Sequence, residues 1–113
     1  MVLPRNLASP NDDVFRACKQ FGWRTFATSP FNRGWLLDRL LAAAAKEDRE
    51  KPDTLRRRLA DLLLRFSVHC PDVDHVIIGI RKPEWIPLDL ASAGKGPLSE
   101  SEMEWLQQLL AAG

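Results

Sequence analysis

The segment 75–80, HVIIGI, is the most informative part of the chain for its fold class. It is a short, continuous run of apolar residues, whereas a strand with one face in water would alternate apolar and polar residues. Strands that are covered on both faces lose this alternation, and such strands are typical of parallel sheets. The segment therefore predicts a strand that is buried on both faces of a parallel sheet.

Helices are expected on both sides of this segment. Upstream, a helix follows Pro52 and ends before Pro71; its apolar positions are Leu55, Leu59, Leu62, Leu63 and Phe66. We expect Asp53 or Thr54 to cap it, and Arg57 and Asp61 to form an ion pair four residues apart. Downstream, a helix is predicted over 83–93, although Pro87 should shorten or kink it.

The two ends of the chain extend this alternation of helices and strands. A first helix begins at Asn11 as N-cap and ends near Gly22, and it is followed by a predicted strand over 23–28. A further helix is expected over 34–46, residues 2–3 form a very short strand, and Ser99 and Glu102 make a capping box for a last helix. The pattern predicts an α/β fold with short parallel strands and about five helices.

Composition limits the class of protein. The 113 residues are 45% hydrophobic and 27% charged with a formal net charge of +1, which is typical of one soluble domain over 1–113. No apolar run approaches the roughly 18–20 residues of a membrane span, and residues 1–10 lack the apolar core of a secretory signal. The low net charge gives no reason to expect binding to nucleic acid or a membrane. Cys18 and Cys70 are expected to be reduced thiols in a cytoplasmic protein.

Two segments of the chain carry recognisable motifs: SPFNRG at 29–34, and 74–90, which contains VIIGIRKPEWIPLDL. The first resembles the loop after the seventh strand of aldo/keto reductases, and the second resembles that family's eighth strand and the cofactor loop that follows. The leucine-rich helix between them and the GPLSE segment at 96–100 also fit, so the resemblance covers nearly the whole chain. It implies a (β/α)8 TIM barrel. Since such barrels need about 250 residues, this chain would hold only the last three β/α units.

The resemblance also implies what the chain can and cannot do. Intact relatives reduce carbonyl groups by hydride transfer from NADPH, and their catalytic Asp, Tyr, Lys and His come from earlier strands that this chain does not match. The chain contains no Tyr, although the family's proton donor is a Tyr. We therefore expect an NADP-binding segment of an oxidoreductase that has no catalytic residues of its own.

Two groups of residues match the family's cofactor loops. The loop after the seventh strand meets the pyrophosphate, and its counterparts here are Ser29, Phe31, Asn32, Arg33 and Gly34. The loop after the eighth strand meets the adenosine 2′-phosphate, and its counterparts are Gly79, Ile80, Arg81, Lys82, Trp85 and Asp89. Arg81 and Lys82 would favour NADP over NAD, because a phosphate monoester attracts adjacent cations. The family often has Asn at the position of Asp89. The Asp89 carboxylate can accept a hydrogen bond from adenine but, unlike Asn, cannot donate one.

Other readings of the sequence stay open. The chain is alternatively a stand-alone α/β module for interaction or oligomerisation, or the remnant of a truncated gene without a function. Its helices can cover only one face of a small parallel sheet, and the sheet has free edges. We therefore expect a homo-oligomer or a complementing barrel half as the partner. His69 and Cys70 lack the spacing of metal ligands, so no metal is expected.

Overall fold

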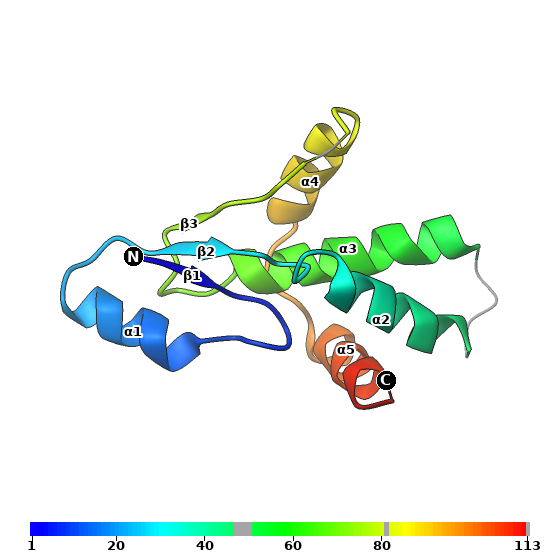
Figure 1. Ribbon diagram of the computed structural model, residues 1–113, viewed down its shortest axis with the longest axis horizontal. Coiled ribbons are helices and arrows are strands. Elements are labelled where there is room, and N and C mark those ends of the chain that lie inside the picture. Colours follow the sequence, from blue (N-terminus) through cyan, green and yellow to red (C-terminus); the bar gives the residue numbers. More distant parts are fainter. Residues whose placement is uncertain (47–50, 81, 113) are drawn as a thin grey trace.

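The computed structural model describes residues 1–46, 51–80 and 82–112, and it has the predicted α/β architecture (Figure 1). The three strands are parallel and lie in the order β1-β2-β3 in one open sheet. Along the described chain the elements are β1 (Val2–Pro4), α1 (Asp12–Gln20), β2 (Phe26–Thr28), α2 (Trp35–Ala45), α3 (Pro52–Val68), β3 (His75–Val76), α4 (Trp85–Ala93) and α5 (Glu100–Ala112). The α/β class, the short parallel strands and the five helices expected from the sequence are confirmed in these residues.

Two of the strands are shorter than the sequence predicts. The predicted strand 23–28 pairs only from Phe26 to Thr28, and the predicted strand 75–80 pairs only over its first two residues. β2 ends because the backbone of Ser29 takes a left-handed conformation, with a φ of 53°. The amide of Ile77 still donates to the carbonyl of Ala27 at 2.8 Å, and residues 78–80 then extend past the end of β2.

The helices cover only one face of the sheet. Leu3, Ala27 and Val76 lie in register and point to the same face, where Ala27 is fully buried. The residues that point to the opposite face are Val2, Phe26, His75 and Ile77. Val2 is 62% exposed and Ile77 is 50% exposed. The prediction that 75–80 is buried on both faces is therefore wrong, because no second layer of described residues covers this side of the sheet.

The hydrophobic core lies mainly between helices. α3 has 17 residues and occupies the middle of the molecule, where it packs against α2 and α4 (Figure 1). Its predicted apolar stripe is confirmed by the burial of Leu55, Leu59, Leu62 and Leu63, with Phe66 partly buried. α2 and α5 complete the core with Leu36, Leu37, Leu40, Leu106 and Leu109. The prediction that Asp53 or Thr54 caps α3 is wrong, since Lys51 is the N-cap and Pro52 suits the first turn.

The helix ends show which of the predicted caps form. The capping box of α5 is confirmed: the Ser99 amide donates to Glu102 Oε1 at 2.9 Å, and the Glu102 amide donates to Ser99 Oγ at 3.1 Å. Asn11 is the N-cap of α1 by position, but its side chain makes no capping hydrogen bond. Pro87 lies in the first turn of α4, because this helix begins at Trp85 rather than at residue 83. Proline is tolerated there.

α4 packs against α3 and projects away from α2 and α5 (Figure 1). The radius of gyration is 14.2 Å, slightly above the value of about 13 Å that a compact chain of this length would have. Among the described residues, no helix combines the length and the apolar character that a membrane span requires.

Candidate functional site

The carboxyl ends of the three strands lie at the same edge of the sheet, because the strands are parallel. Asn6, just after β1, is 1% exposed and joins two of these ends. Its Nδ2 donates to the carbonyl of Ser29 at 3.0 Å, and its Oδ1 accepts from the amides of Ala8 and Ser9 at 3.0 and 2.9 Å. Asn6 therefore fixes the loop after β2 relative to β1.

The loop after β2 has an unusual backbone. Asn32, Arg33 and Gly34 take left-handed conformations in succession, with φ values of 48°, 59° and 84°, and Ser29 shares this region. For residues with a Cβ atom this conformation is strained, and it persists only where the surrounding structure imposes it. Such strain is concentrated at ligand-binding sites in proteins.

Two of the loop amides already have partners. The amides of Asn32 and Gly34 donate to the carbonyls of Ser29 and Phe31, and the amide of Trp35 donates to Asn32. Phe31 packs against the hydrophobic core and anchors the loop there. Arg33 is exposed. At this loop a phosphate group would have Arg33 as the cation and Ser29 as a hydroxyl donor.

The loop after β3, the strand next to β2, carries a second cation. Lys82 is exposed, and its Nζ lies 5.3 Å from the centroid of the Trp85 ring. Gly79 and Ile80 precede it in extended backbone, and the Ile80 side chain lines a groove between β3 and α4. Arg81 lies outside the described residues. Ser29, Asn32 and Arg33 thus follow one strand, and Gly79, Ile80 and Lys82 follow the neighbouring one.

Asp89 is engaged inside the molecule. It is 7% exposed, and its Oδ1 accepts a hydrogen bond from an Arg57 Nη at 3.0 Å. The predicted pair of Arg57 with Asp61 is wrong, since Asp61 pairs with Arg65 and Lys95. Arg57 points toward α4 instead, because a buried carboxylate on that helix needs a cation. An adenine contact of Asp89 stays a prediction.

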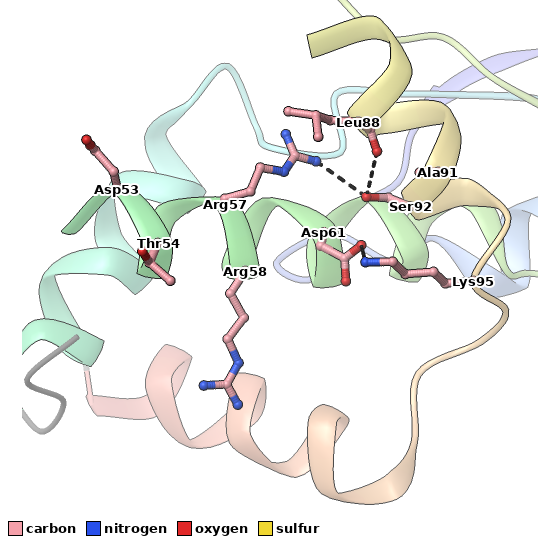
Figure 2. Close-up of a pocket in the computed structure, with 9 residues that line it drawn as sticks. All are labelled: Asp53, Thr54, Arg57, Arg58, Asp61, Leu88, Ala91, Ser92 and Lys95. Atoms are coloured by element: carbon pink, nitrogen blue, oxygen red, sulfur yellow. Dashed lines mark hydrogen bonds and ion pairs between the residues drawn. The ribbon is translucent and has the colours of Figure 1, made fainter. Parts of the chain in front are cut away.

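Figure 2 shows the groove of about 610 Å³ between α3 and α4. Although it is rich in cations, they already have partners: Lys95 binds Asp61 at 3.1 Å, Arg57 binds Asp89, and Arg58 lies over the Trp105 ring. Burial raises the pKa of Asp61, but hydrogen bonds from Ser92, Lys95 and Arg65 outweigh it and hold that pKa below its ordinary value. The groove is thus a charge-compensated junction between two helices.

The sequence patterns did not predict that α4 buries its polar residues and exposes its apolar ones. Its two buried residues, Asp89 and Ser92, are polar, whereas Ile86, Leu88 and Leu90 are 46%, 45% and 70% exposed. The sequence does carry a signal for this inversion: Asp89 and Ser92 are the polar positions of an otherwise apolar helix, and a spacing of three puts them on one side.

The described residues contain no group of three or more His, Cys, Asp or Glu side chains that could hold a metal ion. No family model matches the chain, and no curated protein or solved structure is significantly similar to it. The resemblance to aldo/keto reductases is therefore one of sequence motifs alone.

Proposed function

We propose that the chain binds the phosphate groups of NADP at the carboxyl ends of its strands, and that it contributes the cofactor-binding part of an aldo/keto-reductase-like (β/α)8 barrel. The observation that carries this proposal is the strained loop after β2, which presents the exposed Arg33 at the carboxyl edge of a parallel sheet. Ligands of open α/β sheets bind in the crevice outside this edge.

Each loop has a distinct role in this proposal. Arg33 binds the pyrophosphate, since a guanidinium can donate two parallel hydrogen bonds to phosphate oxygens. Lys82 binds the 2′-phosphate as a point charge, together with Arg81, and thereby selects NADP over NAD. The two free cysteines, Cys18 and Cys70, fit the cytoplasmic location that we propose for the chain.

The proposed role is binding without catalysis. The chain has no Tyr to donate a proton to a carbonyl oxygen, and an open sheet leaves the cofactor without the remaining walls of a barrel. We therefore expect weak binding of NADPH and no NADPH-dependent reduction of aldehydes. Turnover by a preparation proven free of host reductases would contradict this part of the proposal.

Calorimetric titration with NADPH and with NADH tests the binding. We expect NADPH to bind more tightly than NADH, and Lys82→Ala to reduce this preference. Arg33→Ala should weaken the binding of both cofactors alike, by on the order of tenfold, because a charge-assisted hydrogen bond contributes about 1.5–3 kcal/mol. Arg24→Ala is the matched control, since Arg24 is exposed just before β2, at the amino end of the sheet. Equal affinity for both cofactors, or no effect of either variant, would overturn the proposal.

A further inference from the structure

Asn6 is connected to the strained loop 29–34 through a carbonyl group that points toward β1. The carbonyls of an extended strand point alternately to its two neighbouring strands. The Thr28 carbonyl accepts from the Arg5 amide at 2.9 Å and therefore points to β1, so an extended Ser29 would turn its own carbonyl toward β3. Instead, the Ser29 carbonyl accepts from Asn6 Nδ2 at 3.0 Å, on the side of β1.

The left-handed backbone of Ser29 accounts for this reversal. Its φ of 53° departs from the extended conformation that β2 keeps up to Thr28. The same carbonyl also accepts from the Asn32 amide at 3.0 Å, so it closes a turn over residues 29–32. One carbonyl is thus held by two donors, one from within the loop and one from the end of β1.

The side chain of Asn6 is itself held in one orientation. It is 1% exposed, and its Oδ1 accepts from the amides of Ala8 and Ser9. The backbones of Asn6 and Ser9 also exchange two hydrogen bonds of 3.1 Å. Because the side-chain amide donates on one side and accepts on the other, its partners fix which way it points. A buried polar group with satisfied partners makes the segments that it joins rigid.

We propose that Asn6 is a positioning residue of the phosphate site: by holding the Ser29 carbonyl, it maintains the backbone that places Arg33. Asn32 and Arg33 have φ values of 48° and 59°, and such conformations persist only where the surrounding structure imposes them. Phe31 anchors the loop on the core, and Asn6 anchors its beginning on β1. The expected effect of Asn6 on NADPH rests on the proposed function, whereas its effect on the loop does not.

The variant Asn6→Asp separates the connection to the loop from the turn that follows β1. The aspartate keeps one oxygen for the two amides of that turn, but it replaces the amide donor with a second acceptor facing the Ser29 carbonyl. Asn6→Ala removes both contacts without adding a charge. Ser67→Ala is the matched control, since the Ser67 hydroxyl is fully buried and donates to the carbonyl of Arg5, the residue before Asn6, at 2.6 Å.

Hydrogen exchange of backbone amides tests the loop without a ligand. In both Asn6 variants we expect the amides of Asn32 and Gly34 to exchange faster, by on the order of tenfold, because their hydrogen bonds close the turns of the loop. The Ile77 amide, which donates to β2, should exchange as before. Ser67→Ala should leave the loop amides unchanged. Equal exchange of these amides in the unmodified chain and in all variants would overturn the inference.

Calorimetric titration with NADPH tests whether Asn6 acts through Arg33. Arg33→Ala should weaken binding on the order of tenfold in the unmodified chain and in Ser67→Ala, but by less than about threefold in Asn6→Asp, where the guanidinium is no longer held in place. A full effect of Arg33→Ala in Asn6→Asp would overturn the positioning role. Absence of NADPH binding by the unmodified chain would overturn the proposed function and with it the role at a phosphate site, whereas faster exchange in the Asn6 variants would still show that Asn6 holds the loop.

Discussion

α3 and α4 lie against each other, but α3 buries mainly apolar residues and α4 buries polar ones. α3 turns Leu59 and Leu63 into the core and carries exposed charges such as Arg56 on its outer side. α4 turns Asp89 and Ser92 inward and leaves Leu90 exposed to solvent. The difference follows from what each helix faces: α3 packs against α2, α4 and β3, whereas among the described helices α4 has only α3 as a neighbour. The side of a helix that packs against a neighbour is therefore not always apolar.

Truncating a leucine in each helix should give the largest contrast. Leu59→Ala removes a fully buried side chain of α3 and should lower the free energy of unfolding by about 2–5 kcal/mol, because a cavity remains in the core. Leu88→Ala in α4, at 45% exposure, should cost less than about 1 kcal/mol.

Urea denaturation measures both effects. Both variants are to be compared with the unmodified chain at the same protein concentration. Equal destabilisation by the two changes would show that the outer face of α4 is packed within one chain, and the contrast between the helices would fail.

The ion pair between the two helices should have the next largest effect. Asp89→Ala leaves the Arg57 guanidinium without its carboxylate in a site where the Asp89 side chain is 9% exposed. We expect a loss of about 1–3 kcal/mol, because the half-buried guanidinium of Arg57 loses a hydrogen bond to a charged partner. Arg57→Ala together with Asp89→Ala should cost less than the two single changes added together.

A double-mutant cycle by thermal unfolding measures this coupling. Ser92→Ala is a useful comparison, since the Ser92 hydroxyl lies at 3.4 Å from the same Arg57 nitrogen, a longer contact than that of Asp89. If the two losses simply add, Arg57 and Asp89 do not hold α4 against α3.

The ends of the helices provide a smaller test. α5 has a capping box made by Ser99 and Glu102, whereas α4 has Glu84 at its N-cap without a side-chain hydrogen bond. Ser99→Ala should destabilise the protein by about 1 kcal/mol, as loss of an N-cap hydroxyl does. Glu84→Ala should have little effect on unfolding. A comparable loss for both would indicate a cap on α4 that its backbone conformation does not explain.

The sequence predicted the elements that rest on local chemistry. The leucine stripe of α3, the capping box of α5 and the short strand at residues 2–3 all follow from spacing and cap residues within a few positions. Their existence does not depend on how many strands the sheet has. The ion pair of Arg57 shows the limit of this reasoning, since local spacing favoured Asp61 and the folded chain supplied Asp89 from another helix.

The errors arose where burial depends on distant parts of the chain. The run 75–80 indicates a strand covered on both faces, but whether a second layer exists is a property of the whole sheet. Similarly, the motif 29–34 predicts a loop at a strand end, whereas the left-handed backbone of Ser29 and Arg33 is visible only in the folded chain. The cofactor that these residues are proposed to bind remains a prediction from the motifs.

We expect acid to weaken the packing of α4 against α3 before α3 itself unfolds. This is the smallest of the four effects that we predict for these helices. Burial acts to raise the pKa of Asp61, but hydrogen bonds from Ser92, Lys95 and Arg65 lower it below its ordinary value of 3.8. A carboxylate with a lowered pKa in the folded state stabilises that state above 3.8, and this contribution is lost as the pH falls through the lower folded value. Since Ser92 and Lys95 lie within and just after α4, protonation of Asp61 weakens the junction with that helix.

Backbone amide resonances followed from pH 7 to pH 2 distinguish the two helices. We expect the signals of α4 to shift first and those of the α3 core to change only at global unfolding, with a contribution below about 1 kcal/mol for a partly exposed ion pair. Asp61→Asn should abolish the early step, whereas Asp13→Asn, at a side chain 96% exposed on α1, should leave it in place. A single transition shared by α3 and α4 in all three proteins would mean that the junction is as firm as the core, because the polar contacts of Asp61 would then not limit the attachment of α4.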